Sequence, residues 1–159
     1  MTPIDWAKRP LQKYADFSGR APRPEYWWFV LAMFLLLIIV RFVESTLGLD
    51  GTIAGTYGPI SLLLMLATLA PSLAVAVRRL HDSDRSGWWM LLGVPYMIAS
   101  ILAVRAMGAG DASGLATGGM VFLIGLACAL VLLVFMILPG TKGDNRFGPQ
   151  LPEAPGAAT

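Results

Sequence analysis

The chain has little charge, a single cysteine and a single histidine. Asp, Glu, Lys and Arg make up 14% of its 159 residues, whereas hydrophobic residues make up 56%. A soluble domain of this length could accommodate that balance only by burying almost every apolar side chain. Because Cys128 has no second cysteine to join, an intramolecular disulfide is excluded, and so is a metal site of the paired-cysteine type. The shortage of charge favours a domain embedded in a membrane.

The sequence also lacks the signatures of common enzyme and nucleic-acid-binding classes. Its formal charge is only +2 and its basic residues are spread among several loops, so we predict no nucleic-acid partner. Gly140-Thr141-Lys142 lacks the glycine spacing and the Lys-Ser/Thr order of a phosphate-binding P-loop. His81-Asp82 has no nearby Ser or Cys with an evident oxyanion arrangement, which argues against a hydrolase triad. We therefore predict no catalytic residues, no cofactor and no enzymatic activity.

Four long apolar blocks dominate what is present. They lie at 26–47, 58–77, 87–104 and 118–138, and each is close to the roughly 20 residues that a helix needs to cross the hydrocarbon core. The apolar residues come in these blocks rather than in a helical or strand-like alternation with polar ones. The sequence predicts an all-α membrane protein with four transmembrane helices, which together form one domain at 26–138.

Basic residues gather beside alternate ends of these blocks. Lys and Arg are frequent before the first block, between the second and third, and after the fourth, whereas the other two connections contribute only Arg105. By the positive-inside rule, both termini face the cytoplasm. We expect no signal peptide, because a long polar segment precedes the first block and that block is too long for a signal sequence. The expected topology is multi-pass.

Two of the blocks contain residues that are unusual in a membrane. Pro71 lies inside the second block, where its missing N–H predicts a bend, with Thr68 and Ser72 placed to satisfy the released backbone groups. Arg41 and Glu44 lie three residues apart near the outer end of the first block. We predict that these two side chains pair with each other or extend toward the interface.

The chain outside the four blocks divides into three parts. In residues 1–25, apolar and basic residues are interleaved, which predicts a short interfacial helix on the inner leaflet; Pro10 interrupts the pattern, and a loosely ordered basic tail is the alternative. Residues 139–149 form a Gly-rich cytoplasmic motif, and residues 150–159 are predicted to be a disordered tail. The apolar members of the first part are Trp6, Leu11, Tyr14 and Phe17, and the basic members are Lys8, Arg9 and Lys13.

Three polar stretches beside the predicted cytoplasmic ends carry a family resemblance. Residues 17–27 read FSGRAPRPEYW, residues 78–89 contain RRLHD and then SGWW, and residues 140–149 read GTKGDNRFGP. This ordered set resembles the three signatures of the bacterial inner-membrane family known as domain of unknown function 805, the YhaH-like proteins. Asp84 departs from the family pattern, because a small residue such as Gly is often found there. The resemblance implies an integral protein of the bacterial inner membrane with unassigned biochemistry, and it brings no catalytic residues.

We interpret the three motif segments, 17–28, 78–89 and 139–149, as a cluster that fastens neighbouring parts of the chain together. In this latch hypothesis, arginines of one segment pair with acids of another beneath the helices, and the result is a structural platform. Asp84 is expected to join the pairing. The candidate cluster consists of Arg20, Arg23, Glu25, Arg78, Arg79, His81, Asp82, Arg85, Lys142, Asp144, Asn145 and Arg146.

The same residues allow other uses. Basic residues outnumber acids in the cluster, so the platform could bind anionic lipid headgroups, a partner membrane protein or a second copy of the chain. A small-solute transporter acting as an oligomer is the functional alternative, and an embedded, titrating Glu44 would favour it. We predict no metal, because adjacent His and Asp residues seldom bind one ion; the available ligands are His81, Asp82, Asp84, Asp144 and Asn145.

Overall fold

The computed structural model describes residues 1–49, 51, 57–109 and 112–150, apart from the side chains of 99, 103–109 and 112–118. Its ordered elements are helices, and an isolated β-bridge joins Asn145 and Gly148. The predicted all-α fold is confirmed. The helices are α1 (Pro3–Gln12), α2 (Arg23–Thr46), α3 (Pro59–Asp82), the 3-10 helix η1 (Gly87–Leu92), α4 (Gly93–Ala109) and α5 (Ala112–Ile137).

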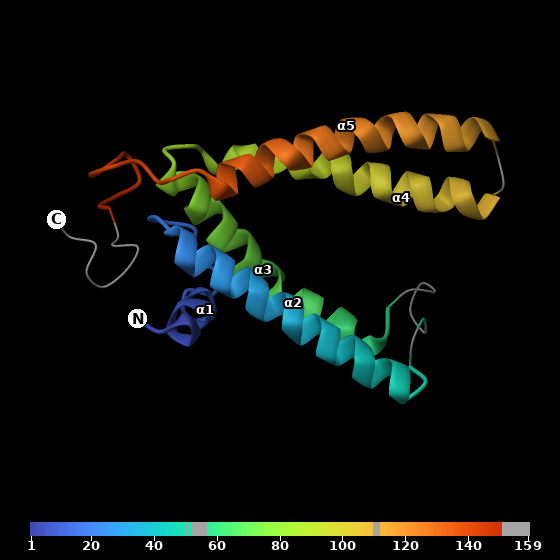
Figure 1. Cartoon of the computed structure of the whole chain (residues 1–159), viewed down its shortest axis with the longest axis horizontal. Coiled ribbons are helices and arrows are strands. Elements are labelled where there is room, and N and C mark those ends of the chain that lie inside the picture. The colour runs from blue at the N-terminus through green and yellow to red at the C-terminus, as the bar shows by residue number, and fades with distance from the viewer. Residues whose placement is uncertain (50, 52–56, 110–111, 151–159) are drawn as a thin grey trace.

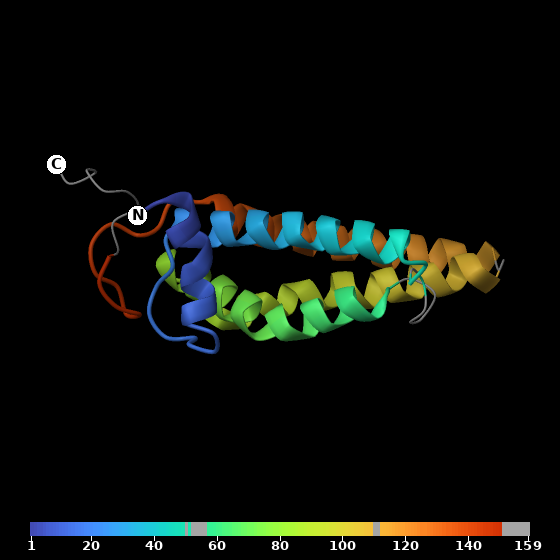
Figure 2. The same cartoon turned by 90° about the horizontal axis from the view of Figure 1, so that it is seen from below.

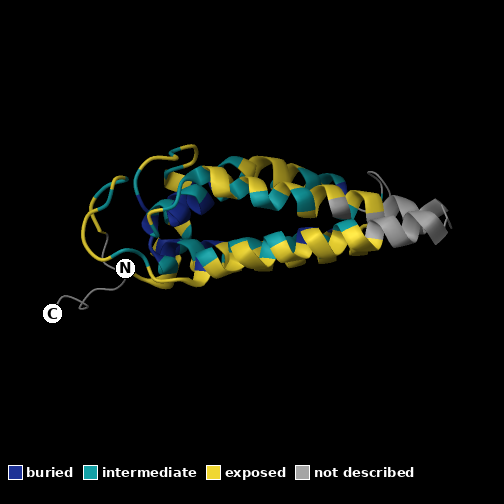
Figure 3. Cartoon of the chain, turned by 90° about the horizontal axis from the view of Figure 1, so that it is seen from above, coloured by how far each residue is buried: buried dark blue, intermediate teal, exposed yellow. Residues whose placement is uncertain are grey.

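Three of the helices are long and apolar enough to cross a membrane. They are α2, α3 and the stretch Gly119–Ile137 of α5. The third predicted block corresponds to a shorter apolar helix, Gly87–Leu102, which begins as η1 and continues into α4. Most large apolar side chains on these helices are exposed, as expected for surfaces that meet lipid acyl chains instead of water (Figure 3).

The helices form two hairpins that diverge from a shared end (Figure 1). One hairpin is α2 with α3, and the other is α4 with α5. The start of α2, the end of α3, η1 and the segment 138–149 meet where the hairpins join, and we call this region the motif end. Buried residues concentrate there (Figure 3). The opposite end of the α2–α3 hairpin, where α2 stops at Thr46 and α3 starts at Pro59, is called the far end.

Helix α1 crosses α2 and α3 on the side away from the second hairpin (Figure 2). It starts with a capping box, in which Thr2 and Asp5 exchange hydrogen bonds. Trp6 and Pro10 are buried against the hairpin, whereas Ile4 and Leu11 face outward. The predicted short N-terminal helix is therefore present, although Trp6 packs on protein and not on the leaflet.

Helix α3 continues past its predicted end. The sequence predicts a stop at Arg78, but the helix includes all of Arg78–Asp82. It ends in a Schellman motif, in which Arg85 N–H donates to the Leu80 carbonyl (2.9 Å) and Asp84 N–H donates to the His81 carbonyl (3.0 Å). Asp84 has a φ of 56°, in the left-handed region where Gly is usual. The tight turn thus forms despite the departure from the family pattern.

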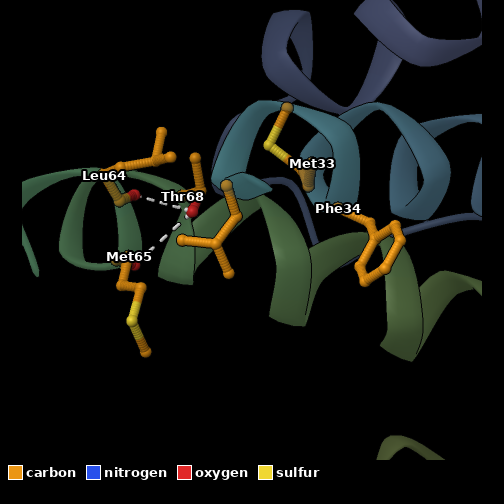
Figure 4. Close-up of a pocket in the computed structure, with 6 residues that line it drawn as sticks. Met33, Phe34, Leu64, Met65 and Thr68 are labelled. Carbon is orange, nitrogen blue, oxygen red and sulfur yellow. Dashed lines mark hydrogen bonds between the residues drawn. The ribbon is translucent and has the colours of Figure 1, made fainter. Parts of the chain in front are cut away.

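Pro71 leaves the Ala67 carbonyl without its helical N–H donor, and Tyr14 replaces that donor. The Tyr14 hydroxyl, from the segment after α1, donates to this carbonyl. The sequence predicts Thr68 and Ser72 for this role. For Thr68 this is wrong, because its hydroxyl donates to the Leu64 carbonyl at 2.8 Å (Figure 4). A residue 53 positions away from Ala67 therefore satisfies the backbone group that proline frees.

Helices α4 and α5 approach each other closely at a glycine. A Cβ atom added to Gly125 would lie 2.6 Å from Tyr96 Cα, a separation that packed atoms do not tolerate. This hairpin is therefore held together by close backbone packing. Ahead of it, the Ser86 side chain caps η1 by accepting from Trp88 N–H (3.4 Å).

Candidate functional site

Asp82 is the centre of the motif end. Arg20 Nε donates to Asp82 Oδ1 at 2.9 Å, and Arg79 Nη1 donates to Oδ2 at 2.5 Å. All three side chains are buried, with exposed fractions of 4% or less. One carboxylate thus joins the first motif segment to the last turn of α3 through two charge-assisted bonds.

Arg20 extends this link to the third motif segment. Its two terminal nitrogens donate to the Thr141 carbonyl (2.7 Å) and the Gly143 carbonyl (2.7 Å). Weaker bonds reach the carbonyls of Asp82 (3.3 Å) and Gly148 (3.4 Å). A single guanidinium of the first motif segment therefore contacts the other two, and its partners lie 62 or more positions away in the chain.

Arg79 ties the end of α5 to the same carboxylate. It donates to the carbonyls of Met136 (3.1 Å, from Nε) and Leu138. Arg23 Nε also donates to the Leu138 carbonyl, at 3.3 Å. The last carbonyls of a helix have no partner within it and carry partial negative charge, so two cations placed there satisfy and stabilise the end of α5.

The third motif segment folds directly onto the end of α3. Thr141 N–H donates to the Asp82 carbonyl (2.8 Å), and the Asn145 side-chain amide donates to the His81 carbonyl (2.9 Å). Gly140 lies so close to Asp82 that a Cβ at this position would collide with the carboxylate. The glycine is needed here because the backbone must approach a side chain that is already held by two arginines.

His81 contributes packing as well as a hydrogen bond. Its Nδ1 lies 3.1 Å from the Gly19 carbonyl, and its ring stacks on Phe147 with 3.8 Å between centroids and 3° between planes. His81 therefore also touches the first and third motif segments. The cluster predicted from the sequence includes His81 but omits Phe147. The only sequence signal for Phe147 is its place in the closing motif, directly before Gly148.

A second buried ionic group lies beside the first. Arg78 Nη1 donates to Glu25 Oε1 at 2.7 Å, and Arg9 Nε lies 3.3 Å from Glu25 Oε2, close enough for an ion pair but not aligned for a hydrogen bond. Both Arg78 and Glu25 are fully buried. Arg78 Nε and Nη2 make no hydrogen bond with the described residues. Glu25 therefore binds α1 to α3 from the first turn of α2.

The remaining candidates lie at the edge of the cluster. Arg85 covers the face of the Phe135 ring, with 4.1 Å from its guanidinium carbon to the ring centroid. Arg146 pairs with Asp84 at 3.2 Å, and both side chains are largely exposed. Lys142 and Asp144 are also exposed. Asp144 accepts from Gln150 N–H (3.4 Å), and in the described part of the chain it does not pair with an arginine, contrary to the latch hypothesis.

The geometry indicates what this cluster can do chemically. Both oxygens of Asp82 and one of Glu25 accept from arginines, so these acids are engaged. Within the described residues, His, Cys, Asp and Glu side chains do not converge in groups of three or more. The arrangement is suited to holding segments together, and its arginines point mainly at carbonyls and carboxylates of the protein itself.

The far end holds one more buried acid, which the sequence predicts to lie near the interface. Glu44 is fully buried; its Oε1 accepts from Ser61 N–H at 2.8 Å, in the first turn of α3. Arg41 Nη1 lies 3.5 Å from Glu44 Oε2, so the predicted pairing is confirmed. The main partner of Glu44 is nevertheless the helix start, where a carboxylate satisfies N–H groups that have no helical acceptor.

Comparison with known proteins agrees with these motifs. The family described as Protein of unknown function (DUF805) matches residues 14–149, which include all three motif segments. Two Escherichia coli (strain K12) proteins are similar to this chain: Inner membrane protein YhaI is 36% identical over 91% of this chain and 93% of its own length, and Inner membrane protein YhaH is 33% identical over 92% and 95%. Uncharacterized protein YiiR of the same strain is 26% identical over 84% of each chain.

No solved structure matches this chain. Two of these relatives, YhaI and YhaH, are named inner membrane proteins, and three helices of this chain are long and apolar enough to cross a membrane. The protein is therefore a multi-pass protein of the bacterial inner membrane, and by the match over residues 14–149 it belongs to the DUF805 family.

Proposed function

We propose that this protein is a four-span inner-membrane scaffold whose motif end is a rigid, non-catalytic platform on the cytoplasmic side. The observation that carries the proposal is the position of Asp82, which joins Arg20, Arg79 and the backbone of the third motif segment in one buried network. Loss of any member of such a network lowers the stability of the protein. The intact network holds the surface above it in one arrangement. A fixed surface is what a lipid or a membrane-protein partner can recognise without an ordering cost.

The lengths of the helices support four crossings. Helix α4 has 17 residues, which rise about 25 Å, and the six residues of η1 add about 12 Å. Together they exceed the roughly 30 Å of the hydrocarbon core. Because α4 packs along α5 in the second hairpin, a crossing by α5 carries α4 through the bilayer with it (Figure 1).

The distribution of charge supports the orientation. The basic residues of the motif end include Arg20, Arg23, Arg78, Arg79 and Arg85. Among the described residues toward the far end, α2 contributes Arg41. Basic residues at membrane-protein ends favour the cytoplasmic side. The N-terminus lies at the motif end in Figure 1, and the segment 138–149, which precedes the C-terminal tail, is part of that end, so both termini are then cytoplasmic.

The transporter alternative has less support. The cavity between α2 and α3 has a volume of about 170 Å³ and is lined mainly by apolar side chains, among them Met33, Phe34 and Met65 (Figure 4). Ligand pockets are usually larger, about 300–1,000 Å³, and contain convergent polar groups. Glu44 is embedded, as a transporter would need, but its carboxylate caps α3.

Cysteine labelling tests the proposed topology. On a Cys128→Ala background, Lys13→Cys and Ser83→Cys should react with a membrane-impermeant maleimide only when the cytoplasmic face is accessible. Leu47→Cys, at the far end, and Ser113→Cys, at the start of α5, should react only from the periplasm. Reaction of Ser83→Cys from the periplasm would overturn the orientation, and reaction of Ser113→Cys from the cytoplasm would remove the third and fourth crossings.

Hydrogen exchange tests the rigid platform. The Thr141 and Ala21 amides donate to carbonyls of α3 at 2.8 and 2.9 Å, so they should exchange slowly in the wild-type protein. In Asp82→Asn both should exchange faster, because the arginines that hold their segments lose a partner. Fast exchange of these amides in the wild type would show that the motif end is not a pre-organised surface.

A further inference from the structure

We propose that the outward face of α1 binds the phosphate headgroup of an anionic phospholipid, with Lys8 and Arg9 as the recognising cations. This site deepens the proposed function, since it rests on the motif end lying at the cytoplasmic leaflet. It differs from the Asp82 network, whose arginines face the interior of the protein. The lipid would fasten the platform to the bilayer at a defined point.

A depression marks the position. It has a volume of about 430 Å³ and is lined by Met1, Asp5, Lys8, Arg9 and Gln12. The carboxylate of Asp5 is engaged in the helix cap, where its Oδ2 accepts from Thr2 N–H (2.7 Å) and the Thr2 hydroxyl (2.8 Å). Lys8 is exposed and makes no ion pair with the described residues. The cationic side of the depression is therefore available to an external anion.

The buried charge behind the depression is also net positive. Glu25 is shared by Arg9 and Arg78, so one carboxylate faces two guanidinium groups. Arg78 is fully buried and has two nitrogens without a hydrogen-bond partner in the described structure. A phosphate beside Arg9 would supply the second negative charge, because it could accept from Arg9 while Glu25 stays with Arg78.

Apolar side chains beside the depression fit the acyl part of a lipid. Ile4 and Leu11 are 64% and 43% exposed and lie four and three residues from Lys8, which puts all three on one face of α1. The opposite face, with Trp6 and Pro10, packs on the hairpin. An interfacial helix that presents both cations and exposed aliphatic residues matches an anionic lipid better than an acidic protein, which would leave Ile4 and Leu11 in water.

Native mass spectrometry of the full-length protein tests this site. The protein is reconstituted with phosphatidylcholine and phosphatidylglycerol in equal amounts, extracted gently, and the retained lipids are counted. Lys8→Gln should retain phosphatidylglycerol about fivefold more weakly, which is the contribution of one basic residue near an anionic surface. Lys8→Arg should restore retention. Lys142→Gln, which removes an exposed lysine from the third motif segment, is the matched control and should behave as wild type.

Three results would overturn the site. They are unchanged phosphatidylglycerol retention in Lys8→Gln, an equal loss in Lys142→Gln, or an equal loss of phosphatidylcholine. Slow exchange of the Thr141 amide in Lys8→Gln would show that the variant is folded and that the Asp82 network is intact. If Lys8→Gln retains phosphatidylglycerol as well as wild type while the Thr141 amide stays protected, the headgroup site is rejected and the proposed platform is not. If Ser83→Cys reacts from the periplasm, the cytoplasmic orientation of the platform is rejected instead.

Discussion

Asp82 and Glu44 are buried carboxylates near opposite ends of the α2–α3 hairpin, and they are held in different ways. Asp82 accepts from Arg79 of the same helix and from Arg20, 62 positions away, and its carbonyl accepts from Thr141 of the third motif segment, so two of its three partners come from distant parts of the chain. Glu44 accepts from the backbone of Ser61 and pairs with Arg41, so its partners come from the same helix and the next one. The motif end is closed by long-range ion pairs and the far end by a local helix cap.

This difference explains where tertiary structure concentrates in the molecule. In a bilayer the apolar helix surfaces gain little from meeting each other, since lipid is equally apolar. Polar contacts and close backbone packing must then decide which segments associate. The motif end has many such contacts, and the two hairpins meet there and diverge beyond it (Figure 1).

The largest effect is expected at Asp82. Asp82→Asn leaves Arg20 and Arg79 buried with one charge partner fewer, which should lower the free energy of unfolding by about 3–5 kcal/mol. Thermal unfolding in detergent, followed by tryptophan fluorescence, measures the change. Asp144→Asn is the matched control, because that acid is exposed and unpaired with arginine among the described residues; it should change stability by about 0.5 kcal/mol or less. Equal losses in the two variants would contradict the buried network.

A smaller effect is expected at Glu44. Glu44→Gln keeps the shape of the side chain but weakens the bond to Ser61 N–H and the pairing with Arg41, at a cost of about 1.5–3 kcal/mol. Hydrogen exchange should show faster opening of the Ser61 amide with no change at Thr141. If Thr141 also opened, the two ends of the hairpin would be coupled and the contrast between them would not hold.

Gly125 extends the comparison to the second hairpin, where α5 approaches the backbone of α4 closely. In Gly125→Ala the added methyl group would collide with the backbone of Tyr96, and the strain should cost about 1–3 kcal/mol. Gly119→Ala is the control on the same helix, because an added Cβ there meets no atom within 4 Å. Because alanine favours a helix more than glycine does, Gly119→Ala should leave the melting temperature unchanged or raise it, and an equal lowering by both substitutions would contradict the close approach to α4 as the cause.

The smallest effect is expected at Tyr14. Tyr14→Phe removes the donor to the Ala67 carbonyl and should cost about 0.5–1.5 kcal/mol. The cost should shrink in a Pro71→Ala background, because the alanine introduced there has a backbone N–H that can donate to the same carbonyl. A double-mutant cycle based on thermal unfolding measures this coupling. Additive losses would show that the Tyr14 hydroxyl does not compensate for proline.

Particular residues show how far sequence reasoning extends. Helix starts can be recognised in the sequence because they follow local rules: Pro24 lies in the first turn of α2, and Ser86 caps η1. The end of α3 is predicted too early, because Arg78 and Arg79 look like interfacial charges until Glu25 and Asp82 are seen to neutralise them in the interior. Arg9 and Tyr14 stand out in the sequence only as members of an amphipathic pattern, which does not predict their partners.

The predicted disordered tail, the fourth membrane crossing and the cytoplasmic orientation are predictions that the described residues do not test. The disordered tail falls on 151–159, apart from Gln150, and lies outside the part of the chain that the structure describes. The fourth crossing and the cytoplasmic orientation stay predictions that labelling checks. The assignment of the chain to its family, which rested on three short polar stretches, is confirmed by the match over residues 14–149.

The sequence by itself determined the class of the protein, its helical content and its location in the inner membrane. These properties depend on the length of apolar runs and on local backbone chemistry, which are written into consecutive residues. Only the tertiary structure decided that Arg20 and Arg79 share Asp82, that Arg78 and Arg9 share Glu25, and that Tyr14 serves Ala67. Any arginine can reach any nearby carboxylate, so the choice among partners is made by which backbone segments the fold brings within a few ångströms.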